Sequence, residues 1–183
     1  MNDLFSALVG KERKFNKPVI VLVNPISNLE KLDLDYKLHI DGAYGGFVYP
    51  FSNKNSTINF SNPKISSITI DAHKMLQSPY GTGVYLCRKG LIENVLTKEA
   101  EYVEGMDLTL CGSRSGANAV AVYMILFTYG PYGWYEKISV LLMRTNWFCK
   151  QLDQLSIPYY RNEHMNIVTL YSSHVPKDIA EKF

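Results

Sequence analysis

The stretch Ser67–Gly83, SITIDAHKMLQSPYGTG, joins an extended segment to a sharp turn. Apolar and polar residues alternate up to Asp71, a pattern typical of a β-strand with two different faces. His73 and Lys74 follow at once, before a turn rich in proline and glycine. The next apolar segment, Gly83–Arg88, begins too soon for a parallel crossover, which needs about a dozen residues. We therefore expect Gly83–Arg88 to pair antiparallel with the strand before it.

Two further strands are predicted upstream. Pro18–Val23 (PVIVLV) is continuously apolar and β-branched, as in a parallel strand buried on both faces. Lys37–Asp41 (KLHID) is a short strand that the glycines of Gly42–Gly46 end. The segment Tyr49–Lys64 is rich in Asn, Ser and Pro, and we interpret it as loop. These patterns favour an α/β fold with a mostly parallel sheet.

Helical spacing dominates the second half of the chain. Ala117–Phe127 and the apolar residues from Ile138 to Leu155 predict two helices, separated by the Gly/Pro-rich segment Gly130–Gly133. A strand at Ile167–Tyr171 and the start of a helix at Pro176–Phe183 are predicted beyond them.

This order of elements predicts a division of the chain. We expect residues 1–133 to form part of a large domain. Residues 134–183 then form a long linking helix and the start of a small C-terminal α+β domain.

The composition excludes several kinds of partner. The chain has 183 residues, 46% of them hydrophobic, and a net charge of +2, with no basic tract for nucleic acid. Its most apolar run, Ala117–Tyr129, is shorter than the roughly 20 residues of a membrane span. The cysteines at 87, 111 and 149 form no CxxC pair, and the histidines show no metal-ligand spacing. We expect a cytoplasmic protein with reduced thiols, and no metal, membrane or nucleic-acid site.

Titratable side chains stand at two neighbouring strand ends. Asp41 ends one strand and Lys74 follows another, so both are expected beyond the carboxyl ends of the sheet, where ligands bind in open α/β folds. An ordinary salt bridge is the simplest explanation. Pyridoxal phosphate, however, needs a lysine for its Schiff base, and an acid beside its pyridinium nitrogen. Ala43 is small enough to lie against such a flat ring.

Three motifs together resemble one enzyme family. HIDGAYGG (His39–Gly46), SITIDAHK (Ser67–Lys74) and GSRSGA (Gly112–Ala117) resemble, in order and spacing, motifs of the group II pyridoxal-phosphate-dependent amino acid decarboxylases. This family holds glutamate, tyrosine, aromatic amino acid and histidine decarboxylases, with sphingosine phosphate lyases as cousins. The resemblance runs from about Val19 to the C-terminus. It implies the fold-type I architecture, in which the lysine-bearing strand turns into the single antiparallel strand of the sheet.

The resemblance also implies roles for individual residues. Lys74 is similar to the Schiff-base lysine, and Asp41 to the partner of the pyridine nitrogen. Ala43 is similar to the residue that packs on the ring, and His73 to the histidine near the cofactor phosphate.

A loop before the first long helix resembles a subunit-bridging element. Gly112 and Ser113, with Arg114, resemble a loop that approaches the phosphate of the neighbouring subunit's cofactor, which implies a homodimer. The same loop could simply begin a helix, with Ser115 as its cap. Both interpretations are compatible, since a helix N-terminus also favours anions.

The implied activity is decarboxylation of an L-amino acid to its amine and carbon dioxide through a Schiff base on Lys74. One alternative is a carbon–carbon lyase of the sphingosine phosphate lyase type, because the sequence does not show which bond breaks or which amino acid binds. Another is a catalytically inactive partial domain. The family's upstream phosphate loop and ring-stacking side chain have no counterpart here: residues 1–17 contain one glycine and no histidine.

Overall fold

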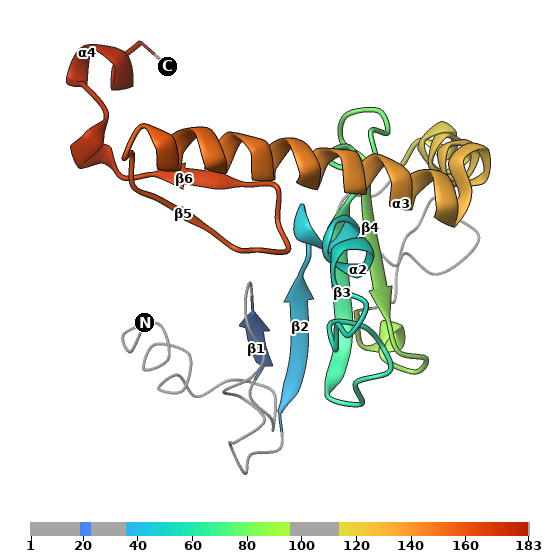
Figure 1. Cartoon of the computed structure of the whole chain (residues 1–183). Helices are drawn as coiled ribbons and strands as arrows, with labels where there is room; N and C mark the ends of the chain where they lie inside the picture. The colour runs from blue at the N-terminus through green and yellow to red at the C-terminus, as the bar shows by residue number, and fades with distance from the viewer. Residues whose placement is uncertain (1–18, 23–35, 96–113, 183) are drawn as a thin grey trace.

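The computed structural model describes residues 19–22, 36–95 and 114–182. Within them, a four-stranded sheet has the order β1 (Val19–Leu22), β2 (Lys37–Asp41), β3 (Ile65–Asp71) and β4 (Gly83–Cys87) (Figure 1). β1, β2 and β3 are parallel, and β4 pairs antiparallel with β3. The predicted α/β fold, with one antiparallel strand after the lysine turn, is confirmed.

The two faces of this sheet differ in chemistry. On β2, Leu38 and Ile40 are buried, whereas Lys37 and Asp41 are exposed and His39 is half-buried. The buried side belongs to a core cluster of Tyr36, Leu38, Ile40, Ile65 and Ile68. Alternation along the strands therefore leaves the His39 and Asp41 side chains on the face opposite this core.

The segment after β2 is more regular than the sequence suggests. A 3₁₀ turn, η2 (Gly45–Phe47), leads into one turn of helix, α2 (Tyr49–Ser52), where we had expected loop. Pro50 lies in the first turn of α2, where its missing N–H costs no hydrogen bond. A short η3 (Ile92–Val95) follows β4.

One long helix covers the carboxyl ends of the strands. α3 (Gly116–Gln154) breaks at Gly130, whose φ of 57° is left-handed, and Pro131 follows. Trp134 packs with Ala72 and Leu76, just after β3, and Ile138 packs with Val48 and Met75. The two predicted helices are therefore confirmed: they are the two segments of α3, on either side of the kink at the expected Gly/Pro interruption.

A small hairpin follows the helix. β5 (Tyr159–Arg161) and β6 (Val168–Leu170) pair antiparallel beside the end of α3, and η4 (Ser172–His174) and α4 (Lys177–Ala180) follow (Figure 1). Arg161 fixes the hairpin, since Nε donates to the carbonyl of Met165 and Nη1 to Asn146 Oδ1. None of the described helices is apolar over a stretch long enough to cross a membrane.

Candidate active site

Lys74 lies in a tight turn directly after β3. The Lys74 N–H donates to the carbonyl of Asp71 at 3.0 Å, and Gln77 closes the turn on the Lys74 carbonyl at 3.1 Å. The Lys74 Nζ is 2.8 Å from Asp71 Oδ2, while 42% of the lysine side chain stays exposed. The lysine is therefore paired within its own turn, yet remains open to solvent and to a ligand.

Asp41 ends β2 on the polar sheet face, and its surroundings link it to the lysine turn. Its Oδ1 accepts the Ala43 N–H at 3.1 Å. Gly42 donates its N–H to the Thr69 carbonyl at 2.9 Å, and the Asp71 N–H donates to the Ala43 carbonyl at 3.0 Å. Backbone hydrogen bonds thus join the Asp41–Ala43 corner to the strand end that delivers Lys74.

Gly42 makes this corner possible. A Cβ at this position would lie 3.0 Å from the Thr69 carbonyl oxygen and 3.0 Å from the Gly46 Cα. Both neighbours are backbone atoms and cannot move aside as a flexible side chain can. The close approach therefore requires glycine, and it sets where the Asp41 strand end meets β3.

His73 is held in one orientation. Its Nδ1 lies 2.9 Å from the Thr82 carbonyl oxygen, and its ring meets Tyr80 edge-on at 5.3 Å between centroids. A carbonyl oxygen only accepts, so Nδ1 carries the proton and Nε2 is the ring nitrogen that remains for another partner. The Thr82 hydroxyl in turn donates to the Pro79 carbonyl at 2.7 Å.

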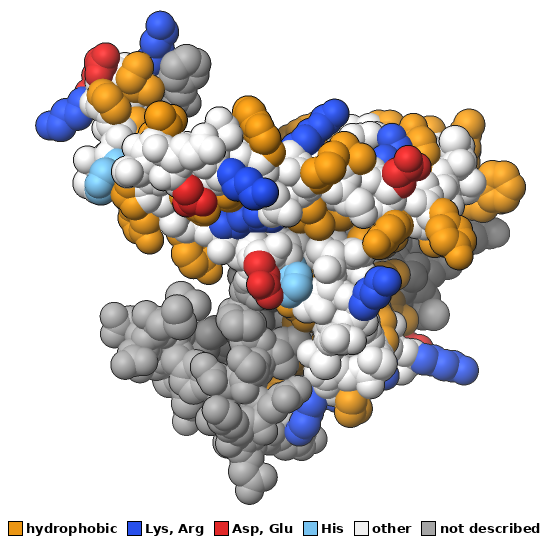
Figure 2. Space-filling model, viewed as in Figure 1, with side chains coloured by type: hydrophobic (Ala, Val, Ile, Leu, Met, Phe, Trp, Pro, Cys, Tyr) orange, Lys and Arg blue, Asp and Glu red, His pale blue; other side chains and the backbone are white. Residues whose placement is uncertain are grey.

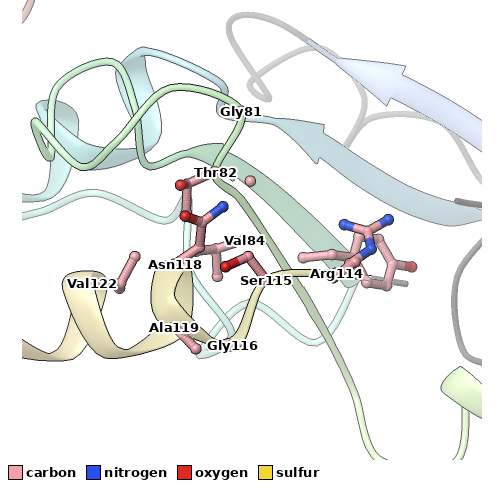
Figure 3. A pocket seen from close by; sticks show the side chains of 11 residues that line it. Gly81, Thr82, Val84, Arg114, Ser115, Gly116, Asn118, Ala119 and Val122 are labelled. Carbon is pink, nitrogen blue, oxygen red and sulfur yellow. The ribbon is translucent and has the colours of Figure 1, made fainter. Parts of the chain in front are cut away.

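A pocket lies where β4 meets the start of α3. Figure 3 shows Thr82 and Val84 close to Asn118 of α3, with Ser115 and Arg114 following along the chain segment that leads into the helix. Ser115 takes the N-cap position, as predicted, although its side chain makes no cap hydrogen bond. Gly112 and Ser113 lie outside the described residues, and their predicted role stays a prediction.

A second, more apolar cleft borders the same corner from the other sheet face. Residues 41–46 form one wall, and Ile40, Ile68 and Ile70 of the sheet form its floor. Met165 and Ile167 close it from the hairpin. Asp41 therefore lies at the border between the polar sheet face and this apolar cleft.

Two residues of this site were missed in the sequence. Asp71 was treated as a strand end, although its spacing of three from Lys74 within a turn is the spacing of a local ion pair. His39 is a half-buried residue of the polar sheet face, two positions before Asp41, and strand alternation could have placed both on one side. Burial lowers the pKa of the His39 imidazole, and the nearby Asp41 charge partly offsets this by raising it.

Comparison with curated proteins gives consistent relatives. The chain is 58% identical to a tryptophan decarboxylase of Clostridium sporogenes over 154 residues, which are 84% of this chain and 37% of that protein. It is 34% identical to a probable L-tyrosine/L-aspartate decarboxylase of Methanocella arvoryzae, covering 87% of this chain and 44% of the relative. The chain thus spans less than half the length of these two relatives. No protein-family model matches the chain.

Solved structures show the same fold. A sphingosine-1-phosphate lyase from Burkholderia pseudomallei matches with a TM-score of 0.60 and 25% identity, over 78% of this chain and 36% of that one. A glutamate decarboxylase from Lactobacillus brevis matches with a TM-score of 0.64 and 20% identity, over 78% and 33%. The structural neighbours confirm the fold-type I architecture, and the relatives confirm the resemblance that the three motifs carry. The chain is therefore similar to group II pyridoxal-phosphate-dependent amino acid decarboxylases and matches a part of the length of these relatives.

Proposed function

We propose that this chain carries the lysine and acid of a pyridoxal phosphate site and serves the decarboxylation of an L-amino acid to its amine. The observation that supports this most directly is the joining of the Asp41–Ala43 corner to the end of β3, beside the Lys74 turn. A relative at 58% identity is named a tryptophan decarboxylase, so we propose L-tryptophan as the first substrate to test.

The described residues fit this cofactor by their chemistry. Asp41 is an exposed carboxylate at a strand end, suited to hold a proton on a ring nitrogen. Lys74 offers a partly exposed amine, and Ala43 offers a small side chain. When bound, pyridoxal phosphate supplies an electron sink for cleavage at the α-carbon of an amino acid.

Lys74 must first become a neutral amine, and the carboxylate in contact with it is Asp71. An ammonium group cannot attack a carbonyl, so Lys74 must lose a proton and leave its partner. Asp71 Oδ2 lies 2.8 Å from Nζ, within reach of that proton. His73, held through Nδ1, is the residue proposed to lie near the cofactor phosphate, to which it would donate from Nε2 as the imidazolium.

We also propose a homodimer, on the basis of one apolar surface. The first half of α3 exposes large hydrophobic side chains, and Figure 2 shows them gathered at that end of the molecule. They include Val120, Tyr123, Met124 and Phe127, with exposures of 57%, 65%, 60% and 77%. Exposed apolar area of this kind favours association. The free cysteines Cys87 and Cys149 suit a cytoplasmic location.

Labelling of the full chain tests the proposal. The chain is mixed with pyridoxal phosphate, reduced with borohydride and digested, and the modified lysine is located by mass spectrometry. We expect the label on Lys74, its loss in Lys74→Ala, and its retention in the control Lys54→Ala, whose exposed lysine lies over Tyr135. Tryptamine release from L-tryptophan then measures activity.

The outcomes separate the alternatives. Label on Lys74 together with amine product supports the decarboxylase. Label without product supports the inactive partial domain, and aldehyde release from a phosphorylated amino alcohol supports the carbon–carbon lyase. Absence of label from Lys74 in a folded chain contradicts the cofactor site itself.

A further inference from the structure

The polar face of the sheet carries a connected group of side chains next to Asp41. His39 and Asp41 share this face of β2, and His39 is in register with Ser67 of β3, while Asp41 is in register with Thr69. Tyr85 of β4 stacks on the His39 ring with centroids 6.1 Å apart and planes at 25°. The group formed by His39, Ser67, Thr69 and Tyr85 therefore spans β2, β3 and β4, next to Asp41, the carboxylate proposed to hold the cofactor.

Both nitrogens of the His39 ring are engaged. Nδ1 lies 2.8 Å from the Ser67 hydroxyl, and Nε2 lies 3.2 Å from the Thr69 hydroxyl. Hydroxyl groups donate or accept, so they satisfy a neutral imidazole in either tautomer. Two such partners fix the plane of the ring without a counter-charge.

The charge of this ring matters to its neighbour. The titratable groups that share the His39 face on the described strands are Lys37, Asp41, Asp71, Tyr85 and Cys87. Of the two carboxylates, Asp41 is the one whose charge raises the pKa of His39. A protonated His39 would offer Asp41 a second cation, whereas a neutral His39 leaves the carboxylate to a cationic ring nitrogen.

We propose that His39 is a positioning residue for Asp41: held between the Ser67 and Thr69 hydroxyls, it keeps the polar end of β2 in place and remains uncharged beside the carboxylate. This inference rests on the proposed cofactor site, and it adds a residue that does not touch the cofactor. Its consequence is that cofactor affinity falls when His39 becomes protonated.

The first experiment needs no cofactor. The histidines of the chain are followed by NMR during a pH titration, and the His39 signal is assigned with His39→Asn. Because the negative charge of Asp41 stabilises the imidazolium, Asp41→Asn should lower the His39 pKa. The matched control Asp153→Asn removes a carboxylate from the far end of α3 and should leave it unchanged. An unchanged His39 pKa in Asp41→Asn overturns the proposal.

The second experiment measures pyridoxal phosphate affinity against pH. Between about pH 7.5 and pH 5.5, the wild-type dissociation constant should rise about two- to fivefold more than that of His39→Asn, which keeps a hydrogen-bonding group but has no charge to gain. His39→Phe, which loses both hydroxyl contacts, should bind more weakly at every pH. The control His174→Asn changes an exposed residue near the C-terminus and should follow the wild type.

The results distinguish this inference from the proposed function. Parallel pH profiles for wild type and His39→Asn would show a merely structural role and overturn the inference. Wild-type chain that takes no cofactor at any pH would contradict the proposed function, and the NMR titration would then decide the coupling of His39 to Asp41 by itself.

Discussion

At the scale of single residues, the contact that most affects the proposed chemistry joins Lys74 to Asp71. The sequence suggested Asp41 as the acid that matters to the lysine, and the structure adds a nearer partner, three residues before it. Asp41, at the neighbouring strand end, instead accepts the Ala43 N–H. Of the two acids, Asp71 is therefore the one that contacts the amine.

Asp71→Asn should speed covalent labelling of Lys74. Loss of the carboxylate removes the 2.8 Å contact that occupies the Lys74 Nζ, so the amine meets an incoming carbonyl without first leaving a partner. The lysine is 42% exposed, and a solvent-screened pair of this kind corresponds to a change of about two- to fivefold. The rate of borohydride-trapped label near neutral pH measures it, with Asp178→Asn on α4 as the control. Slower labelling in Asp71→Asn would instead show that the carboxylate assists the reaction.

Gly42→Ala should destabilise the corner after β2. The added Cβ would meet two backbone atoms at 3.0 Å, so the chain must shift, at a cost of about 1–3 kcal/mol in free energy of unfolding. Gly83→Ala is the matched control, because a Cβ there meets nothing within 4 Å. Urea denaturation compares the two variants, and equal stability would contradict the close approach described for Gly42.

At the scale of elements, strands with a clear periodic pattern were predicted well. β2 and the start of β4 were predicted at their observed bounds, because alternation and flanking glycines mark them. α2 was missed because its one turn, with Pro50 and Ser52, has the composition of a loop. β5 was missed because Tyr159–Arg161 is a strand only through its pairing with β6, a contact that local sequence does not reveal.

Arg88 joins the loop before β3 to the sheet. Its Nε donates to the Ile65 carbonyl at 2.7 Å, and Nη2 donates to the carbonyls of Phe60 and Asn62 at 2.9 and 2.7 Å. Arg88→Lys keeps the charge but cannot span three carbonyls, so the free energy of unfolding should fall by about 2–4 kcal/mol. Thermal denaturation tests this against Lys89→Ala, which changes an exposed side chain. A loss of the same size in both variants would contradict the bridging role.

At the scale of the whole molecule, the C-terminal hairpin is attached to the candidate site. The tip of the hairpin reaches back across the chain: Asn166 donates to the Tyr44 hydroxyl at 2.8 Å, and the Ser52 hydroxyl donates to the His164 carbonyl at 2.8 Å. Motifs could predict the fold, since it rests on local pattern, whereas the roles of Lys74 and Asp41 stay predictions. Motifs could not predict His39 with Ser67, or the hairpin contacts, because those pairs are distant in the chain. The division of the chain near residue 133 stays a prediction.

Tyr44→Phe should loosen the hairpin. The change removes one hydrogen bond and leaves the Asn166 amide without that partner, at a cost of about 0.5–1.5 kcal/mol. Amide hydrogen exchange in residues 162–167 should accelerate, while exchange in β3 should stay slow. The control Tyr132→Phe alters a tyrosine that is 89% exposed. Unchanged exchange at the hairpin tip would show that other contacts hold it.

The Asp71–Lys74 ion pair has a consequence for the life of the protein in a cell. Sugars and metabolic aldehydes react with unprotonated amines, and a lysine prepared for carbonyl chemistry is a natural target for such damage. Asp71 Oδ2 already occupies the Lys74 nitrogen at 2.8 Å, so a sugar must displace this contact before it reacts. We therefore expect more glycation of Lys74 in Asp71→Asn, and mapping sugar adducts on aged wild-type and Asp71→Asn chains measures the difference.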